Sequence, residues 1–110
     1  MAAMSPGTAL RNLQQAQAGL KKIRQLLRLT RESGGDVDVP RVLKAGWDGL
    51  AKAHRMIAEI PVEAATEPVM TKQLAVQRYA TALLVRLRRL ARNEAGALDG
   101  IDDDLDSEEG

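Results

Sequence analysis

The sequence predicts an all-α protein: an elongated antiparallel three-helix bundle followed by an acidic C-terminal tail. Apolar residues recur at steps of three and four over three long stretches, proline follows a capping residue at each start, and glycine or proline separates the stretches. We expect helices over about residues 6–33, 39–60 and 67–95 within a basic bundle of residues 1–98, and the tail over 99–110. At ~1.5 Å rise per residue, the first and third helices would each be roughly 40 Å long.

The first predicted helix begins at Ser5, an N-cap residue that is followed by Pro6 in the first helical position, where the missing N–H costs nothing. Its expected buried seam follows the spacing of a helix that faces a partner helix: Leu13, Ala16, Leu20, Ile23, Leu27 and Thr30. Gly34 and Gly35 supply the left-handed cap that ends it.

The second predicted helix is capped by Asp38 or Val39 and has Pro40 in its first turn. It should stop near Ile60, because the residue before Pro61 is pushed away from helical dihedrals.

The inward face of the second helix is expected to carry Leu43, Trp47, Leu50, His54 and Ile57. Trp47 either fills the widest part of the core or anchors an interface, and a lone His54 on this face is expected to pack with one nitrogen satisfied. Gly46 and Gly49 weaken the helix, which indicates close approach of a neighbouring backbone or of the Trp47 ring.

The third predicted helix repeats the cap-then-proline start at residues 66–68 and ends near residues 93–95, with Gly96 as its C-terminal cap. Its expected seam is Val69, Gln73, Val76, Ala80, Leu83, Leu87 and Leu90. Tyr79 falls at the edge of this stripe, where its hydroxyl can reach water or an interface.

The net charge of +1 conceals two opposed parts of the chain. All sixteen Lys and Arg lie within residues 1–98 against eight acids, giving +8, whereas residues 99–110 hold seven acids and no base, giving −7. The basic residues that we expect to meet a partner are Arg78, Arg86, Arg88, Arg89 and Arg92 on the third helix and Lys21, Lys22, Arg24, Arg28 and Arg31 on the first. The plain alternative is a solvated face that keeps the bundle soluble.

Three acidic partners are compatible with these faces: nucleic acid, the chain's own tail or that of a second copy, and the acidic surface of another protein. Leu98, Ile101 and Leu105 are spaced three and four apart among the acids, so the tail can form a short amphipathic turn, although such a composition also suits a disordered end. Trp47 and Leu29 are further candidate interface anchors, as is Val85 among the arginines. Few aromatic residues and no clear recognition helix count against nucleic acid.

Composition excludes several kinds of site. The chain has no Cys and one His, so we expect no disulfide, no thiolate metal site, no cofactor and no small-molecule substrate, and no catalytic set of residues can be assembled. Asp102, Asp104 and Asp106 alternate as in a calcium loop, but Ser107 stands where glycine is needed. The longest apolar run, residues 82–85, is far below the ~20 residues that span a bilayer, so we expect a location in the cytoplasm or in a particle assembled there.

These observations favour a non-enzymatic helical assembly or adaptor protein, homo-oligomeric and part of a larger multi-subunit particle such as a virion. The argument is that 45% hydrophobic residues with only 2% aromatic form a thin core, and small thin cores gain stability by association. The alternative is a nucleic-acid-binding protein of a packaging or regulatory type, whose acidic tail competes with phosphate for the arginines.

Overall fold

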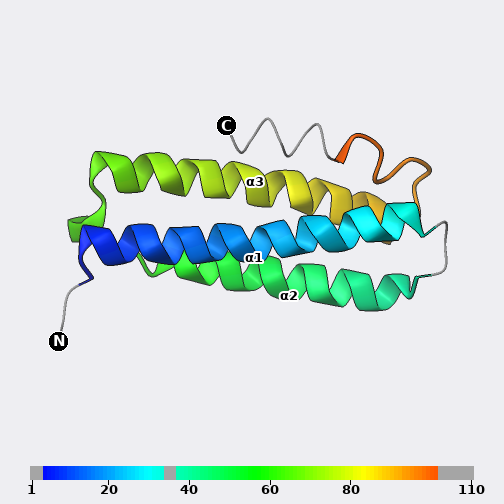
Figure 1. Cartoon of the computed structure of the whole chain (residues 1–110), viewed down its shortest axis with the longest axis horizontal. Helices are drawn as coiled ribbons and strands as arrows, with labels where there is room; N and C mark the ends of the chain where they lie inside the picture. Colours follow the sequence, from blue (N-terminus) through cyan, green and yellow to red (C-terminus); the bar gives the residue numbers. More distant parts are fainter. Residues whose placement is uncertain (1–3, 34–36, 102–110) are drawn as a thin grey trace.

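The computed structural model describes residues 4–33 and 37–101 and shows three helices packed into one elongated bundle (Figure 1). Helix α1 spans Pro6–Glu32, α2 spans Val39–Ala58 and α3 spans Glu67–Ala91, with a short 3₁₀ helix η1, Val62–Ala64, before α3. Each helix contacts the other two, and the molecule measures 48 × 27 × 18 Å. Helices α1 and α3 run in the same direction and α2 runs against both (Figure 1). The predicted all-α bundle is therefore confirmed.

The helix starts follow from local capping. The Ser5 hydroxyl accepts a hydrogen bond from the backbone N–H of Thr8 at 3.1 Å, and the Asp38 carboxylate accepts one from the N–H of Arg41 at 3.3 Å. Thr66 occupies the same position before α3 but makes no side-chain cap bond. All three helices carry proline in the first turn, as the sequence predicted.

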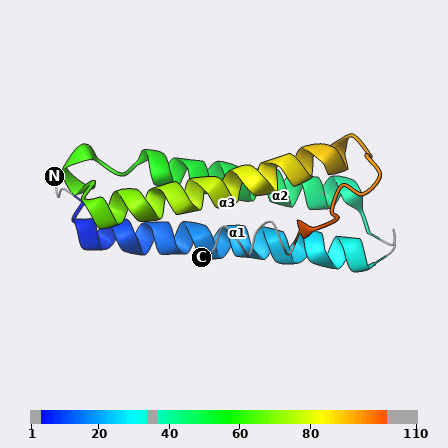
Figure 2. The same ribbon diagram turned by 90° about the horizontal axis from the view of Figure 1, so that it is seen from above.

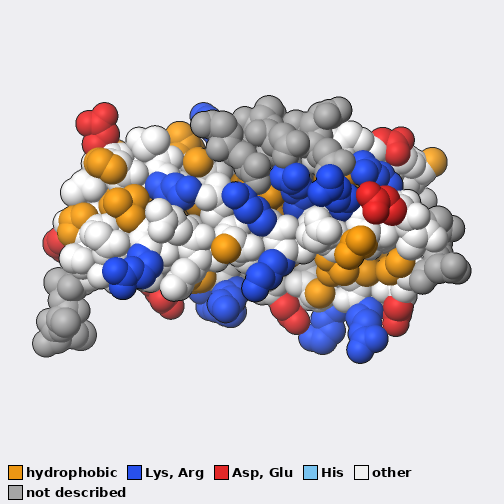
Figure 3. All heavy atoms as spheres, in the orientation of Figure 1, with side chains coloured by type: hydrophobic (Ala, Val, Ile, Leu, Met, Phe, Trp, Pro, Cys, Tyr) orange, Lys and Arg blue, Asp and Glu red, His pale blue; other side chains and the backbone are white. Residues whose placement is uncertain are grey.

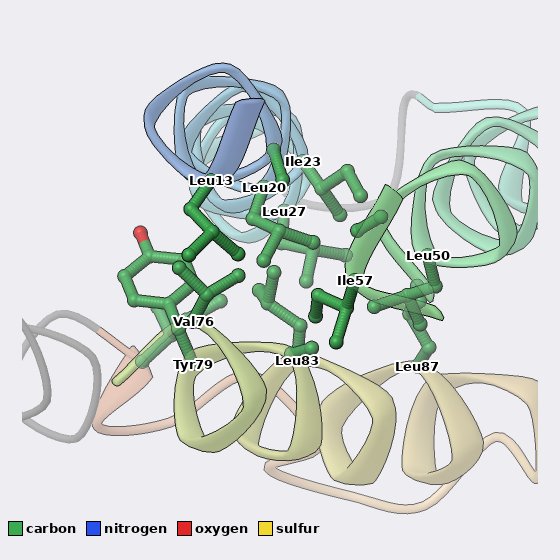
Figure 4. Close-up of a cluster of buried hydrophobic side chains, with 14 of the residues drawn as sticks. Leu13, Leu20, Ile23, Leu27, Leu50, Ile57, Val76, Tyr79, Leu83 and Leu87 are labelled. Atoms are coloured by element: carbon green, nitrogen blue, oxygen red, sulfur yellow. The ribbon is translucent and has the colours of Figure 1, made fainter. Parts of the chain in front are cut away.

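The core lies along the axis of the bundle, where side chains from all three helices meet (Figure 4). The buried residues of α1 are those of the predicted seam with Ala9 added, whereas Thr30 is half-buried. The largest side chains that are fully enclosed are Tyr79, Leu13, Leu20, Leu27, Leu83, Leu87, Ile101, Val69 and Val76.

The buried face of α2 differs from the prediction. Leu50 and Ile57 are buried as expected, but the other buried positions are Val42, Gly46 and Ala53. The predicted seam residue His54 is exposed, and Trp47 is 37% exposed, so neither packs in the core. Leu43 is half-buried.

The two glycines of α2 explain why its buried side differs from the predicted one. A Cβ added to Gly46 would lie 2.7 Å from a methyl carbon of Leu87, and one added to Gly49 would lie 2.5 Å from Cδ1 of Ile23. Large side chains of α3 and α1 therefore press against α2 where it has none. The close approach that the glycines indicated is present, and it comes from these side chains and not from a backbone or the Trp47 ring.

Helix α3 ends earlier than predicted, because Asn93 takes the left-handed conformation with φ of 55°. The N–H of Glu94 donates to the carbonyl of Arg89 at 3.1 Å and the N–H of Asn93 to that of Leu90 at 3.0 Å, which is a Schellman cap. Gly96, the predicted cap, instead shapes the turns that follow, with φ of 70°. The predicted cap of α1, Gly34 and Gly35, lies outside the described residues.

Tyr79 also differs from the prediction, which placed its hydroxyl in water. Its side chain is fully buried, and the hydroxyl oxygen is buried with it. Figure 4 shows the ring on the side of the core away from α2, where α1 and α3 face each other. Tyr79 therefore closes the core along the border between these two helices.

Candidate docking groove between α1 and α3

The border between α1 and α3 is hollowed at the N-terminal ends of the two helices. A hollow of about 620 Å³ is lined by Leu10, Gln17, Glu67, Pro68, Thr71, Lys72 and Ala75. The Lys72 ammonium group donates a hydrogen bond to the side-chain oxygen of Gln17, so these two residues lie opposite each other across the border. This hollow was not predicted from the sequence. Its only local signal was Gln17, a polar residue on the same side of the helix as Leu10.

Basic side chains continue the same border toward the other end of the bundle. One edge of α1 faces this border, and at helical spacing it consists of positions 10, 17, 21, 24, 28 and 31. The facing edge of α3 consists, at the same spacing, of positions 68, 72, 75, 79, 82, 86 and 89. Because the helices are parallel and Gln17 is level with Lys72, Arg24 is level with Tyr79 and Arg31 with Arg86. Figure 3 shows Lys and Arg side chains gathered over α1 and its border with α3.

The segment after α3 turns back onto this border (Figure 2). Leu98 and Ile101 are buried and join the main core, and Ile101 has no exposed surface. Arg86 is only 8% exposed, and its guanidinium Nη1 donates a hydrogen bond of 3.4 Å to the carbonyl oxygen of Ala97. The packed part of the chain therefore reaches Ile101, and Arg86 is one of the groups that hold this last segment in place.

The charge of Arg86 reflects this position. Burial lowers the pKa of its guanidinium below the ordinary value, the neighbouring positive charge of Arg89 lowers it further, and the carboxylate of Asp99 raises it. Arginine keeps its proton at neutral pH even so. The positive charge of Arg86 is thus held at the α1/α3 border, near enough to Asp99 for the two charges to interact.

The predicted basic residues occupy different environments. Seven of the ten are exposed, among them Lys21, Lys22 and Arg31 on α1 and Arg78 and Arg89 on α3. Arg88 on α3 and Arg92 just after it are exposed as well, and Arg24 and Arg28 are half-buried on α1. Arg86 is the exception, because the turn at residues 97–101 covers it. By helical spacing, the α1/α3 border beyond the hollow includes Lys21, Arg24, Arg28, Arg31, Arg86 and Arg89.

The predicted interface anchors also separate into groups. Leu29 is 51% exposed and Trp47 is 37% exposed, so both are available to a partner. Leu98 and Ile101 pack into the chain's own core, and Leu105 lies outside the described residues.

Residues 4–33 and 37–101 also bear on two other kinds of site, a metal site and a membrane-spanning helix. No group of three or more His, Cys, Asp or Glu side chains in this part of the chain could hold a metal ion. None of the three helices is both long enough and apolar enough to cross a membrane. Comparison of the chain with known protein families, curated protein sequences and solved structures finds no match.

Proposed function

We propose that the protein is a non-enzymatic helical adaptor within a larger assembly, and that the α1/α3 groove binds an acidic protein segment. One observation supports the proposal: residues 97–101, which precede the acidic residues 102–110 in the sequence, pack beside Arg86 at the α1/α3 border. The Ala97 carbonyl accepts from Arg86, Asp99 lies close enough to raise the pKa of Arg86, and Ile101 is buried beside them.

The composition of the chain after this point supports the same proposal. Residues 102–110 contain six acids, no base and one large apolar residue, Leu105. The edge of α1 beyond Gln17 carries four basic residues, Lys21, Arg24, Arg28 and Arg31. The row of bases on α1 therefore suits an extended acidic segment that lies along the α1/α3 border. This segment could come from the same chain, from a second copy or from another protein.

The energetics suit exchange between such segments. Ion pairs between exposed groups contribute only about 0.2–1 kcal/mol each, so a segment held by a few of them can be displaced by a competitor of the same kind. We propose that the chain's own acidic end competes with an acidic partner for the groove.

The test measures binding of a labelled peptide with the sequence of residues 99–110. The protein is the full chain, with or without Asn and Gln in place of the six acids after Ile101. We expect the neutralised variant to bind the peptide more tightly than the unaltered chain, and added salt to weaken this binding. The pair Arg28→Glu and Arg31→Glu should weaken it, whereas Lys52→Glu and Arg55→Glu on the exposed part of α2 should not. Absence of binding to the neutralised variant at low salt would contradict the proposal.

Nucleic acid is the competing ligand, because exposed arginines such as Arg78, Arg88 and Arg92 also suit phosphate. Duplex DNA serves as the second probe in the same titration. If the neutralised variant bound DNA with a steep salt dependence and did not bind the peptide, a nucleic-acid-binding function would replace the adaptor function.

A further inference from the structure

We infer that the outer face of α3 pairs with the same face of a second copy of the chain, with the two helices antiparallel. Val85 of one copy would pack against Leu74 of the other. This surface is separate from the α1/α3 groove, so the inference goes beyond the proposed function and does not depend on it.

Large apolar side chains are exposed along this outer face. Met70 is 55% exposed, Leu74 48% and Val85 42%, although all three lie within a regular helix whose opposite side is packed in the core. With Thr81 they form a stripe at helical spacing.

The stripe contains a ready-made hole for a side chain of a facing helix. Met70, Gln73, Leu74 and Gln77 stand at positions i, i+3, i+4 and i+7, and together with Thr71 they line a hollow of about 420 Å³. Four residues at this spacing form the hole that accepts one knob when two helices pack side by side. The other end of the same stripe supplies an exposed β-branched knob, Val85.

Charges at the two ends of α3 fit this arrangement and choose its direction. When Val85 lies opposite Leu74 in an antiparallel pair, Glu67 of each copy lies opposite Arg92 of the other, and both residues are exposed. A parallel pair would instead set Glu67 beside Glu67 and Arg88 beside Arg88. The antiparallel contact is therefore self-complementary about a two-fold axis, with two ion pairs at its ends.

These ion pairs can form only between copies. Glu67 and Arg92 are separated by 25 residues of essentially helical chain, which corresponds to roughly 38 Å. Any energetic coupling between the two residues in solution therefore reports on the contact between two chains.

Sedimentation equilibrium of the full chain over a range of micromolar concentrations tests the inference. We expect the mass to rise to that of two chains, and Val85→Asp to return it to one. Val62→Asp is the matched control, because Val62 is an exposed valine of η1 outside the stripe, and it should leave the dimer unchanged. A monomer at every concentration, or equal effects of the two substitutions, would overturn the inference.

A charge exchange tests the direction of the pair. Glu67→Arg alone or Arg92→Glu alone places like charges together twice in each dimer, and we expect the dissociation constant to rise about tenfold. The chain with both substitutions should recover the original dissociation constant. If the double variant dissociated as readily as the worse single variant, the antiparallel register would be refuted. Circular dichroism of each variant shows whether the helices are retained.

Discussion

Two glycines in the interior of helices provide a direct test of how α2 packs against α3. A Cβ placed on Gly46 would lie 2.7 and 2.8 Å from the two methyl carbons of Leu87, which is fully buried. A Cβ placed on Gly19, in the exposed interior of α1, meets nothing within 4 Å. The substitutions Gly46→Ala and Gly19→Ala therefore make the same chemical change in two environments.

The expected free energies follow from two opposing effects. Replacing glycine by alanine in a helix interior favours the helix by about 0.5–1 kcal/mol, and for Gly19→Ala this is the whole effect on the free energy of unfolding. For Gly46→Ala the same gain is opposed by overpacking against Leu87, which costs about 1–3 kcal/mol in a close-packed core. Gly46→Ala should therefore lower the free energy of unfolding by between nothing and about 2 kcal/mol. The free energy of unfolding of this variant should be about 1–3 kcal/mol lower than that of Gly19→Ala.

Thermal and urea denaturation measure both changes. A stabilisation of 1 kcal/mol raises the Tm of a domain of this size by about 4 °C or more, so the two variants should move in opposite directions or differ clearly. Gly46→Ala is then made in a chain that carries Leu87→Ala. There the methyl group of Ala at position 46 has room, so the substitution should raise the free energy of unfolding. If Gly46→Ala stabilised the unaltered chain as much as Gly19→Ala does, the close packing of Leu87 against Gly46 would be refuted.

Three further substitutions test the C-terminal turn and the surface of α2. Arg86→Ala removes the hydrogen bond to the carbonyl oxygen of Ala97 and should lower the free energy of unfolding by about 1–3 kcal/mol. Arg88→Ala, at an exposed position, should change it by less than about 0.5 kcal/mol. Equal effects of the two substitutions in urea denaturation would contradict the burial of Arg86. Ile101→Ala should cost about 2–5 kcal/mol in the same assay, against almost nothing for exposed Leu29→Ala. His54→Ala should leave the Tm within about 2 °C of the unaltered chain, and a larger fall would show that His54 packs in the core after all.

Helix positions were predictable from the sequence because their causes are local. Ser5 with Pro6, and Asp38 with Pro40, act within a single turn of chain, and the structure begins α1 and α2 where these residues predict. The end of α3 was missed because asparagine can cap a helix as glycine does, and Asn93 comes three residues before Gly96.

The face of α2 was not predictable by the same reasoning. A search for large apolar residues at helical spacing selects Trp47 and passes over Gly46, yet a helix that meets two neighbours packs most closely where its own side chain is smallest. The packing partners, Leu87 and Ile23, lie far away in sequence. Only the arrangement of all three helices decides which face turns inward.

The candidate groove shows the same division between local and non-local causes. The excess of bases on α1 and the acids at the C-terminal end are visible in composition, and Leu98 with Ile101 indicated an amphipathic turn. The burial of Arg86 required the chain to reverse after Asn93 and return to α3. Gly96 and Gly100, both with positive φ, were the local signals of these turns.

The two proposed surfaces lie on different sides of α3. Val85 and Arg86 are consecutive, so their side chains project about 100° apart around the helix, one outward and one onto the border with α1. One copy can therefore use both surfaces at once. An antiparallel dimer would present two grooves related by a two-fold axis, and a partner with two acidic segments would bind the second groove at a high effective concentration. Weak ion pairs of the kind available in each groove would then suffice for a stable assembly, while each contact alone stayed readily exchangeable.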